Sequence, residues 1–503
     1  MPDDIPDSRT SPHTLESSHN RGVQTSPYAH PSNEPDWVAH RGDVVVAVLA
    51  AGHGKRMQSD IPKHLLGVAG MPIIERVIRA GIGARSSQTV VMVGSNMADL
   101  EDRLGMHDAF TLVVQGPPKG TADSVRQALD QAGDASWVVS LLGDSPHLTS
   151  EVVDALIDSA RLSRSKVTLL TCIVDDASAY GRIERDVQDR IVRIVELKND
   201  DPNCRHGRTE INSGVMVLDA VWAREELARL PMDPTTGEFL LTDLIDVAVR
   251  TGADDDGAWP VQAHIAEATV SLGVNDRMDL AQADARARQA IRERHIRNGV
   301  TIIGPDTVFI DERVMIGQDT VIGPHSILTG GTVIGRGCEI GPSAVLHNAR
   351  LADRVAVEQS TVRDSSVGSG THIGPYAHLR GGCRIGQNVH IGSFAELKNA
   401  TLSDGVKCGH VSYLGDVSIG EATNIGAGTI TANYDGHSKH ATTIGEGVFV
   451  GSDSILVAPI NLGDGARTGA GSVVNRDVEP GATVVGVPAR PIAGMDNRRT
   501  QRS

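Results

Sequence analysis

The sequence predicts an α/β domain followed by a parallel β-helix within one chain of 503 residues. Between Asp43 and about Gly273, short apolar runs alternate with amphipathic helical patterns, which is typical of a parallel sheet covered by helices on both faces. After Gly299, an aliphatic residue followed by glycine recurs in a six-residue frame, and such hexads predict the coils of a parallel β-helix. The glycine count of 54 and the aromatic fraction of 3% agree with a fold that packs small side chains tightly.

Charge and composition narrow the class of protein. The net charge of −16 argues against a nucleic-acid partner. No apolar run reaches the roughly 18 residues that cross a membrane, and the first forty residues lack the apolar core of a signal peptide. We therefore expect a cytoplasmic protein without membrane insertion, and a disordered tail over residues 1–42. The cysteines form no C-x-x-C pair, which fits a reducing compartment and indicates no cysteine metal site; they are Cys172, Cys204, Cys338, Cys383 and Cys408.

The first apolar run leads into a glycine loop that suggests phosphate binding. Residues 49–57 read LAAGHGKRM, and a glycine loop with Gly54 and Lys55 after a strand looks like a P-loop, G-x-x-x-x-G-K-[ST]. The P-loop pattern fails because Leu49 stands at the first glycine position and because Arg56, after the lysine, has no hydroxyl for a metal. Three interpretations remain at this point: a degenerate ATP loop, a different phosphate cradle or a tight turn.

Polar residues follow several later strands of this half. Ligands of parallel sheets bind beyond the carboxyl ends of the strands, so we expect these loops to meet there. Two cations with backbone N–H groups suit a polyphosphate, and a strand-end aspartate suits a magnesium ion. Taken singly, each residue could instead be a solvated surface charge or part of a turn. They are Arg56, Lys63, Gln115, Gly120, Thr121, Asp144, Asn212 and Asn275.

Taken as a series, these loops resemble the sugar-1-phosphate nucleotidyltransferases, whose first loop reads L-A-A-G-x-G-T-R-M. The chain differs from that loop at Lys55, where the family usually has threonine, and Leu142 and Phe239 stand where the family often has tyrosine. The resemblance covers essentially all of residues 43–280, and it favours a Rossmann-like nucleotidyltransferase domain over a P-loop. The later motifs keep the order of the family: PKHLL, QGPPKGTA, LLGDSP, YGRI, VELKN, INSGVM, EFLLTD and GVNDR.

This resemblance implies a reaction and a site. In the family, a sugar-phosphate oxygen attacks the α-phosphorus of a nucleoside triphosphate and pyrophosphate leaves, which requires positioning and charge neutralisation. It implies that Asp144 and Asn275 hold Mg²⁺, and that Arg56 and Lys63 are catalytic because they neutralise the phosphates. UTP and the amino sugar of the product would contact Leu49, Ala50, Ala51, Gly52, Lys63, Gln115, Gly120, Thr121, Gly143, Gly181, Glu196, Asn212 and Asn275.

A connecting helix and then the hexads follow. The alanine- and arginine-rich segment 277–298 contains no glycine and predicts a helix that ends before Gly299. The hexad frame then slips three times, and we expect inserted loops with functional residues at these slips. The slips lie between Ile340 and Ile373, between Ile391 and Ile419, and between Ile425 and Ile444, where the separations are 33, 28 and 19 residues.

His410 is the first catalytic candidate of the second half. It lies in the segment KCGHVSYLGD, within the second slip, although a lone histidine could simply line the coil. Cys408 lies two residues earlier and would share the face of His410 on a strand, which suggests a thiol acyl carrier. Cysteine is, however, more often an ordinary buried apolar residue.

The hexads and the motifs YAHLRGG, SFAELKNA, NIGAGTITANYDG and VFVGSDSILVAPINLGDGA resemble the acetyltransferase half of a bifunctional family. Its members combine N-acetylglucosamine-1-phosphate uridylyltransferase with glucosamine-1-phosphate N-acetyltransferase. The resemblance implies a left-handed parallel β-helix of hexapeptide repeats and makes His410 the base for the attacking amine, oriented by Glu396. The acetyltransferase substrate would contact Arg380, Lys398, Tyr413, Asn424, Asn433 and Tyr434, and the co-substrate acetyl-CoA would contact Ala427, Asn433, Tyr434, Ser452 and Ala470.

The end of the β-helix departs from the family. Where relatives can place an arginine for the phosphates of coenzyme A, in an SRVP-like stretch, this chain reads VVGVPAR with Gly486. Arg490 could replace that arginine, or the contact could be missing.

The sequence thus predicts an enzyme that acetylates glucosamine 1-phosphate and then couples the product to UTP, giving UDP-N-acetylglucosamine for bacterial cell-wall synthesis. The family also implies a homotrimer with acyl sites between neighbouring prisms. Two rivals are a single-function nucleotidyltransferase with a scaffold of hexads, which His410 and Lys398 oppose, and a non-catalytic binding protein, which Asp144 and Asn275 oppose. The predicted limits are 1–42 for the tail, 43–275 for the nucleotidyltransferase, 276–299 for the linker helix, 300–488 for the acetyltransferase and 489–503 for a C-terminal tail.

Overall fold

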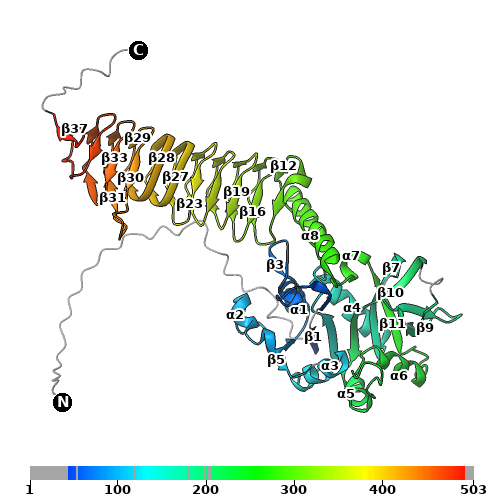
Figure 1. Ribbon diagram of the computed structural model, residues 1–503. Coiled ribbons are helices and arrows are strands. Elements are labelled where there is room, and N and C mark those ends of the chain that lie inside the picture. The colour runs from blue at the N-terminus through cyan, green and yellow to red at the C-terminus, as the bar shows by residue number, and fades with distance from the viewer. Residues whose placement is uncertain are drawn as a thin grey trace, which may run out of the picture.

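The computed structural model describes residues 43–492, apart from 53–54, 118, 178–179, 198–199 and 202–205. The predicted tail 1–42, Cys204 and residues 493–503 of the predicted C-terminal tail lie outside the described residues. Figure 1 shows an α/β half and an elongated β-helix, joined by one long helix.

The α/β half is built on one sheet with strand order β11-β7-β10-β6-β1-β4-β5. Its strands are β1 (Val44–Ala50), β4 (Gln88–Gly94), β5 (Thr111–Gln115), β6 (Trp137–Leu142), β7 (Val167–Asp176), β10 (His206–Asp219) and β11 (Val261–Ala266), with a hairpin of β8 (Arg182–Arg185) and β9 (Ile191–Val195) attached to β10. The helices are α1 (Ile73–Gly83), α2 (Leu100–Leu104), α3 (Thr121–Asp130), α4 (Ser150–Ser163), α5 (Ala220–Arg229), α6 (Asp243–Thr251) and α7 (Ala268–Ser271).

The central strand β1 explains the layering. Its seven residues are all buried because alternate side chains enter two different cores. Val45 and Ala47 pack on the side of α3, α5 and α6, whereas Val46 and Val48 pack on the side of α1 and α4. The predicted sheet with helices on both faces is confirmed.

One strand departs from the expected parallel order. The long strand β10 runs antiparallel to both β6 and β7. Strands β7, β8, β9 and β10 follow one another without a crossover helix, and a parallel arrangement would require such a crossover. The sequence shows only an apolar run there, which does not encode direction.

The linker helix α8 (Arg277–Arg297) begins at Asp276, whose side chain accepts hydrogen bonds from the N–H groups of Met278 and Asp279. The buried side chains of Ala283, Ala287 and Ile291 join α8 to the core of the β-helix.

The two halves are also tied directly. The hairpin of β2 (Gly67–Val68) and β3 (Met71–Pro72) reaches the first coil, where the Glu312 N–H donates to the Ala69 carbonyl at 2.9 Å. Arg76 donates to the Glu312 carboxylate at 2.7 Å, and Arg313 donates to the buried Glu75 at 2.6 Å. Hydrogen bonds across the junction therefore fix how the β-helix meets the α/β half.

The β-helix is a three-sided coil in which each strand pairs in parallel with the strand one coil away. Two long strands, β27 (His390–Leu402) and β28 (Lys407–Ile419), run through all three faces, and β38 (Arg490–Pro491) closes the end antiparallel to β37. Face 1 contains β12 (Thr301–Ile302), β15 (Val321–Ile322), β18 (Glu339–Ile340), β21 (Ala356–Val357), β24 (His372–Ile373), β29 (Asn424–Ile425), β32 (Phe449–Val450), β35 (Arg467–Thr468) and β37 (Thr483–Val485). Face 2 contains β13 (Phe309–Ile310), β16 (Ile327–Thr329), β19 (Val345–His347), β22 (Thr361–Arg363), β25 (His378–Leu379), β30 (Ile430–Ala432), β33 (Ile455–Val457) and β36 (Val473–Val474). Face 3 contains β14 (Met315–Ile316), β17 (Val333–Ile334), β20 (Arg350–Leu351), β23 (Ser366–Val367), β26 (Arg384–Ile385), β31 (Thr442–Ile444) and β34 (Ile460–Leu462).

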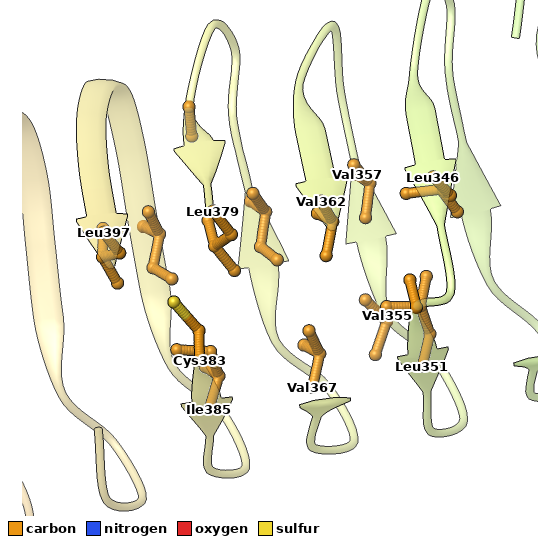
Figure 2. Packing of buried hydrophobic residues seen from close by; sticks show 14 of the residues in the cluster. Leu346, Leu351, Val355, Val357, Val362, Val367, Leu379, Cys383, Ile385 and Leu397 are labelled. Carbon is orange, nitrogen blue, oxygen red and sulfur yellow. The ribbon is translucent and has the colours of Figure 1, made fainter. Parts of the chain in front are cut away.

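Aliphatic side chains fill the coil. Leu346, Val362, Leu379 and Leu397 pair from one coil to the next and are fully buried, as Figure 2 shows. Since every coil presents the same kind of residue inward, the core is continuous along the axis. The predicted parallel β-helix is confirmed.

The expectation of an inserted loop at every frame slip is wrong. The first slip comes from short corners, because Val345 and Arg350 are five residues apart instead of six and both remain in the ladder. The second slip, which holds His410, runs along β27 and β28, and both strands stay in the ladder. The third slip alone leaves the coil, as a hairpin closed by a bridge between Tyr434 and Lys439. The frame counts residues and cannot distinguish a shortened corner from an insertion.

Among the described residues, no helix is long and apolar enough to cross a membrane.

Candidate active sites

The glycine loop of the first half lies at the carboxyl end of β1, beside the loop that follows β6. The Gly143 N–H donates to the Leu49 carbonyl at 2.9 Å. A Cβ atom at Gly143 would lie 2.8 Å from the Ala50 side chain and 3.0 Å from the Leu49 carbonyl oxygen, so only glycine fits there. The chain thus brings Leu49 and Ala50 next to Gly143, and Ala51 and Gly52 follow them in the loop.

Two polar pairs stand beyond these strand ends. Lys63 forms an ion pair with Oδ2 of Asp144, and Arg56 donates to Oδ1 of Asn275 at 3.0 Å. The segment before Asn275 is fixed to the Asp144 loop, because the Val274 N–H donates to the Asp144 carbonyl at 2.8 Å. Four residues from distant parts of the sequence therefore form one cluster. The side chain of Lys55 lies outside the described part of the chain.

The cluster has the donors of a divalent cation site. Oδ1 of Asp144 is buried and has no hydrogen-bond partner within the described residues. The Asn275 amide adds a second oxygen, and magnesium prefers oxygen ligands. A buried acceptor without a partner is costly, so these residues fit a magnesium ion.

His64 is a neighbour that the sequence analysis did not select. It is 3% exposed, and burial lowers the pKa of its imidazole to about 4. Because this pKa lies well below 7, His64 is neutral at physiological pH. It follows Lys63 directly in the chain. No sequence signal marks it, since a histidine beside a lysine ordinarily indicates a surface loop.

The residues expected at the nucleotide lie on the loop between β5 and α3. Gly120 has φ of +104°, and a Cβ atom there would lie 2.4 Å from the carbonyl oxygen of Phe239. Thr121 accepts a hydrogen bond from the Leu241 N–H at 3.0 Å. The oxygen of the nearly buried Gln115 side chain accepts from Ser124 at 3.0 Å, which fixes the orientation of its amide. The segment around Phe239 thus holds this loop in place.

The residues expected at the amino sugar also converge. The Asn212 N–H donates to the Gly181 carbonyl at 2.9 Å. A Cβ atom at Gly181 would lie only 2.5 Å from the Ile194 side chain, and 3.4 Å from the Glu196 carboxylate. Glycine therefore lets β8, β9 and β10 approach closely at this point.

Tyr180 is a second residue that the sequence analysis missed. Its hydroxyl donates to the Gly273 carbonyl at 3.3 Å and accepts from the Gly273 N–H at 3.1 Å, and burial raises its pKa. Tyr180 lines a cavity of about 440 Å³ together with Arg56 and Asn275. The motif YGRI contained it, but only its glycine was selected.

In the second half, His410 is exposed at the corner between faces 1 and 2, where Ser393 pairs with it from the preceding coil. Cys408 points into the core of the coil with no exposed surface, and burial raises the pKa of its thiol to about 11. A thiol that is neutral and inaccessible cannot carry an acyl group. The thiol-carrier interpretation of Cys408 is therefore wrong.

Glu396 lies one coil below Tyr413, and Arg380 lies one coil further below. The two side chains form an ion pair of 2.8 Å. Glu396 faces outward on face 2, whereas Arg380 lies at the corner between faces 2 and 3. The structure thus gives the Glu396 carboxylate the partner Arg380, and the expected contact with His410 stays a prediction.

Lys439 is a third residue that the sequence analysis missed. It comes from the hairpin of the third slip, and its ammonium group lowers the pKa of Lys398 through a hydrogen bond and through charge repulsion. Arg380 adds to this positive charge. Three cations near one another have the charge to attract an anion such as a phosphate, although the Asp416 carboxylate also acts on Lys398.

The same hairpin positions Asn433 and Tyr434. The Asn433 amide donates to the Asp416 carboxylate at 2.5 Å, and the Tyr434 hydroxyl donates to the Gly436 carbonyl at 2.7 Å. Asp435 accepts from the N–H groups of His437 and Ser438, both at 2.7 Å, and pairs with His440 at 2.7 Å. The hairpin is therefore internally fixed.

The residues expected along the acetyl-CoA groove form a row. Ala427, Ser452 and Ala470 each follow a face 1 strand by the same number of residues, so they continue the corner of His410 toward the C-terminus. Asn424 stands on face 1, beside this row.

Comparisons with known proteins agree with both halves. The MobA-like NTP transferase domain model matches residues 46–179. The bacterial transferase hexapeptide model matches residues 313–348 and 364–399, and the model for the hexapeptide repeat of succinyl-transferase matches residues 441–476.

Relatives match along most of the chain. Bifunctional protein GlmU of Brevibacillus brevis is 39% identical over 439 residues, which cover 87% of this chain and 94% of the relative. Bifunctional protein GlmU of Mycobacterium marinum is 39% identical over 460 residues, which cover 90% of this chain and 92% of the relative. That of Corynebacterium glutamicum is 38% identical over 449 residues, which cover 88% and 91%.

Fold, cluster and repeat together define an enzyme in which a nucleotidyltransferase is joined to a hexapeptide-repeat transferase. The chain belongs to the GlmU family of bifunctional enzymes.

Proposed function

We propose that this enzyme makes UDP-N-acetylglucosamine in two steps. The β-helix transfers acetyl from acetyl-CoA to the amine of glucosamine 1-phosphate. The α/β half then transfers uridylyl from UTP to N-acetylglucosamine 1-phosphate and releases pyrophosphate. The observation that carries the proposal is the presence in one member of this family of two sets of residues: the pairs Arg56–Asn275 and Lys63–Asp144 in the α/β half, and the exposed His410 and the cations Arg380, Lys398 and Lys439 in the β-helix.

For uridylyl transfer, the residues act by position and charge. The sugar phosphate is already an anion, so its attack on the α-phosphorus needs no base. Arg56 and Lys63 neutralise charge on the phosphates. Gly143 and Gly120 let the loops of the site pack closely against Leu49 and Phe239, because a Cβ atom at either glycine would collide there. Gly181, Glu196 and Asn212 bind the amino sugar.

Asp144 and Asn275 would hold Mg²⁺, which supplies charge neutralisation at the phosphates. The support is the buried, unpartnered Oδ1 of Asp144, within the described residues, beside the Asn275 amide oxygen.

For acetyl transfer, a base is needed because the amine loses a proton as it attacks. The amine nitrogen forms a bond with the thioester carbon, the bond from carbon to sulfur breaks, and the thiolate of coenzyme A leaves. His410 takes the proton of the amine, and its exposed corner position allows the proton to pass to water. Arg380, Lys398 and Lys439 bind the phosphate of the sugar, and Tyr413, Asn424, Asn433 and Tyr434 surround the sugar ring.

We also propose that the chain acts as a cytoplasmic homotrimer. The support is a strip of exposed apolar side chains at the corner of His410: Tyr376 is 52% exposed, Phe394 60% and Val411 57%. The rings of Tyr376 and Phe394 are stacked with centroids 5.3 Å apart, and both residues have positive φ. Such a strip costs free energy in water unless a neighbouring prism covers it.

A split assay tests the proposed function. We expect His410→Ala to abolish thiol release from acetyl-CoA with glucosamine 1-phosphate and to leave pyrophosphate release from UTP and N-acetylglucosamine 1-phosphate unchanged. Asp144→Ala should do the reverse, because the two sites share no residue. If either variant lost both activities equally, the two-site assignment would be wrong. If the wild type released no thiol, the β-helix would be only a scaffold.

A further inference from the structure

The outward side of face 1 forms a continuous row beside the acetyl-CoA corner. The register pairs Lys407 with Asn424, Asn424 with Phe449, Phe449 with Arg467, and Arg467 with Thr483. Each member of this row lies three residues before a corner position, and the corner positions in the same order are His410, Ala427, Ser452, Ala470 and Gly486. The row therefore follows the groove from the base toward the C-terminal end.

Arg467 is the cation at the far end of this row. Its guanidinium carbon lies 5.1 Å from the centroid of the exposed Phe449 ring, a cation–π contact that holds the planar group against face 1. Among the described residues, Arg467 has no hydrogen bond from its side chain and no carboxylate partner. An oriented arginine with free N–H groups is suited to bind a phosphate.

The chemistry of the donor agrees with this position. Acetyl-CoA has its thioester at one end and its nucleotide phosphates at the other, and the thioester must reach the amine beside His410. The remainder of the molecule must extend away from His410, and the corner row offers the path through Ala427 and Ser452 to Ala470. Arg467 stands on the coil of Ala470, where the phosphates would arrive.

We propose that Arg467, supported by Phe449, is the residue that binds the phosphates of the nucleotide portion of acetyl-CoA. This inference rests on the proposed acetyltransferase function. The proposed contact places a positive charge on face 1. The adjoining corner has no such charge, because this chain has Gly486 at the position where relatives can have an arginine. Arg490 is the rival, but its guanidinium already donates to the neighbouring Ala489 carbonyl at 2.8 Å.

Donors of different length test the assignment. We expect Arg467→Gln to raise the KM for acetyl-CoA by about ten- to a hundred-fold, as the loss of a charged hydrogen bond predicts, with little change in kcat. The KM for S-acetylpantetheine, which lacks the nucleotide, should not change. Acetyl-dephospho-CoA keeps the diphosphate and lacks the 3′-phosphate. If Arg467 binds the diphosphate, Arg467→Gln should raise the KM for this donor as well. If Arg467 binds only the 3′-phosphate, that KM should not change.

Matched variants complete the experiment. Arg384→Gln removes an exposed arginine from face 3 and should leave every KM unchanged, and Phe449→Leu should give a smaller rise than Arg467→Gln. Binding of 3′,5′-ADP, followed by calorimetry, should weaken in Arg467→Gln and not in Arg384→Gln. Uridylyl transfer reports whether each variant is folded.

Several outcomes overturn the assignment. They are an unchanged KM for acetyl-CoA in Arg467→Gln, an equal rise with acetyl-CoA and S-acetylpantetheine, or a rise confined to Arg490→Gln. The proposed acetyltransferase function has its own test. It would be wrong if the wild type transferred acetyl from neither acetyl-CoA nor S-acetylpantetheine.

Discussion

At the scale of single residues, the α/β site depends on groups that have lost water. Asp144 is held by Lys63 through one oxygen, and its other oxygen is buried. The neutral His64 is near enough for the Asp144 charge to act on its pKa. The sequence predicted Lys63 and Asp144 because charges at strand ends carry a recognisable motif. It could not predict His64 or Tyr180, since their roles follow from burial and from contacts with Asp144 and Gly273.

His64 gives a prediction on pH. Its pKa is about 4 in the folded protein and near 6.5 when unfolded, so the unfolded chain binds a proton that the folded chain does not. The stabilisation is complete above pH 6.5 and falls as the pH drops toward 4, by roughly 3 kcal/mol. We expect His64→Leu to flatten this fall in urea unfolding of the α/β half between pH 7 and pH 4.5.

Part of the fall in stability with pH should remain in His64→Leu, because burial also lowers the pKa of His147 to about 4. An identical slope in His64→Leu and in the wild type would contradict the burial of a neutral His64.

At the scale of elements, the pattern of apolar residues predicted whether a segment is a helix or a strand better than it predicted the direction of a strand or the length of a corner. The alternation of apolar residues gave β1, α1 and α3, because burial on two faces determines which positions are apolar. It did not give the antiparallel direction of β10, which depends on the absence of a crossover. The hexads predict the coils, but a break in the six-residue frame does not distinguish the shortened corner before Arg350 from an insertion. Hydrogen bonding between coils tolerates a missing residue at a corner.

The hairpin that carries Lys439 gives the second prediction. Asp435 holds the turn through two backbone N–H groups and His440, and these hydrogen bonds hold the pKa of its carboxyl well below its usual range. We expect Asp435→Ala to loosen the hairpin and to raise the KM for glucosamine 1-phosphate about three- to thirty-fold, because Lys439 leaves its place beside Lys398. Steady-state kinetics with both substrates measure this.

Glu446→Ala, on a turn between β31 and β32, is the matched control and should keep the wild-type KM. A loss of uridylyl transfer in Asp435→Ala would show a general folding defect instead of a local one.

At the scale of the whole molecule, the junction makes the two halves one body. Glu75 is fully buried and is bonded by Arg313 from the first coil and by Arg79 from its own helix. The sequence predicted two functions and a connecting helix, but not this junction, because contacts between residues more than 200 positions apart leave no local pattern.

The number of stacked coils determines how far the two candidate active sites lie from each other. Six coil-to-coil steps lead from β12, next to the α/β half, to β28 with His410. At about 4.8 Å per step, His410 lies roughly 29 Å along the axis from the start of the β-helix. A sugar phosphate at the proposed Lys398 site cannot span that distance, so we expect the acetylated intermediate to dissociate into water before it is uridylylated.

Free diffusion of the intermediate is measurable as isotope dilution. With labelled acetyl-CoA, UTP and glucosamine 1-phosphate, we expect added unlabelled N-acetylglucosamine 1-phosphate to lower the label in UDP-N-acetylglucosamine in proportion to its share of the pool. Label that resisted dilution would require a protected passage along the prism. The length of the β-helix thus makes the enzyme a competitor for its own intermediate, and any other protein that binds N-acetylglucosamine 1-phosphate can draw on the same pool.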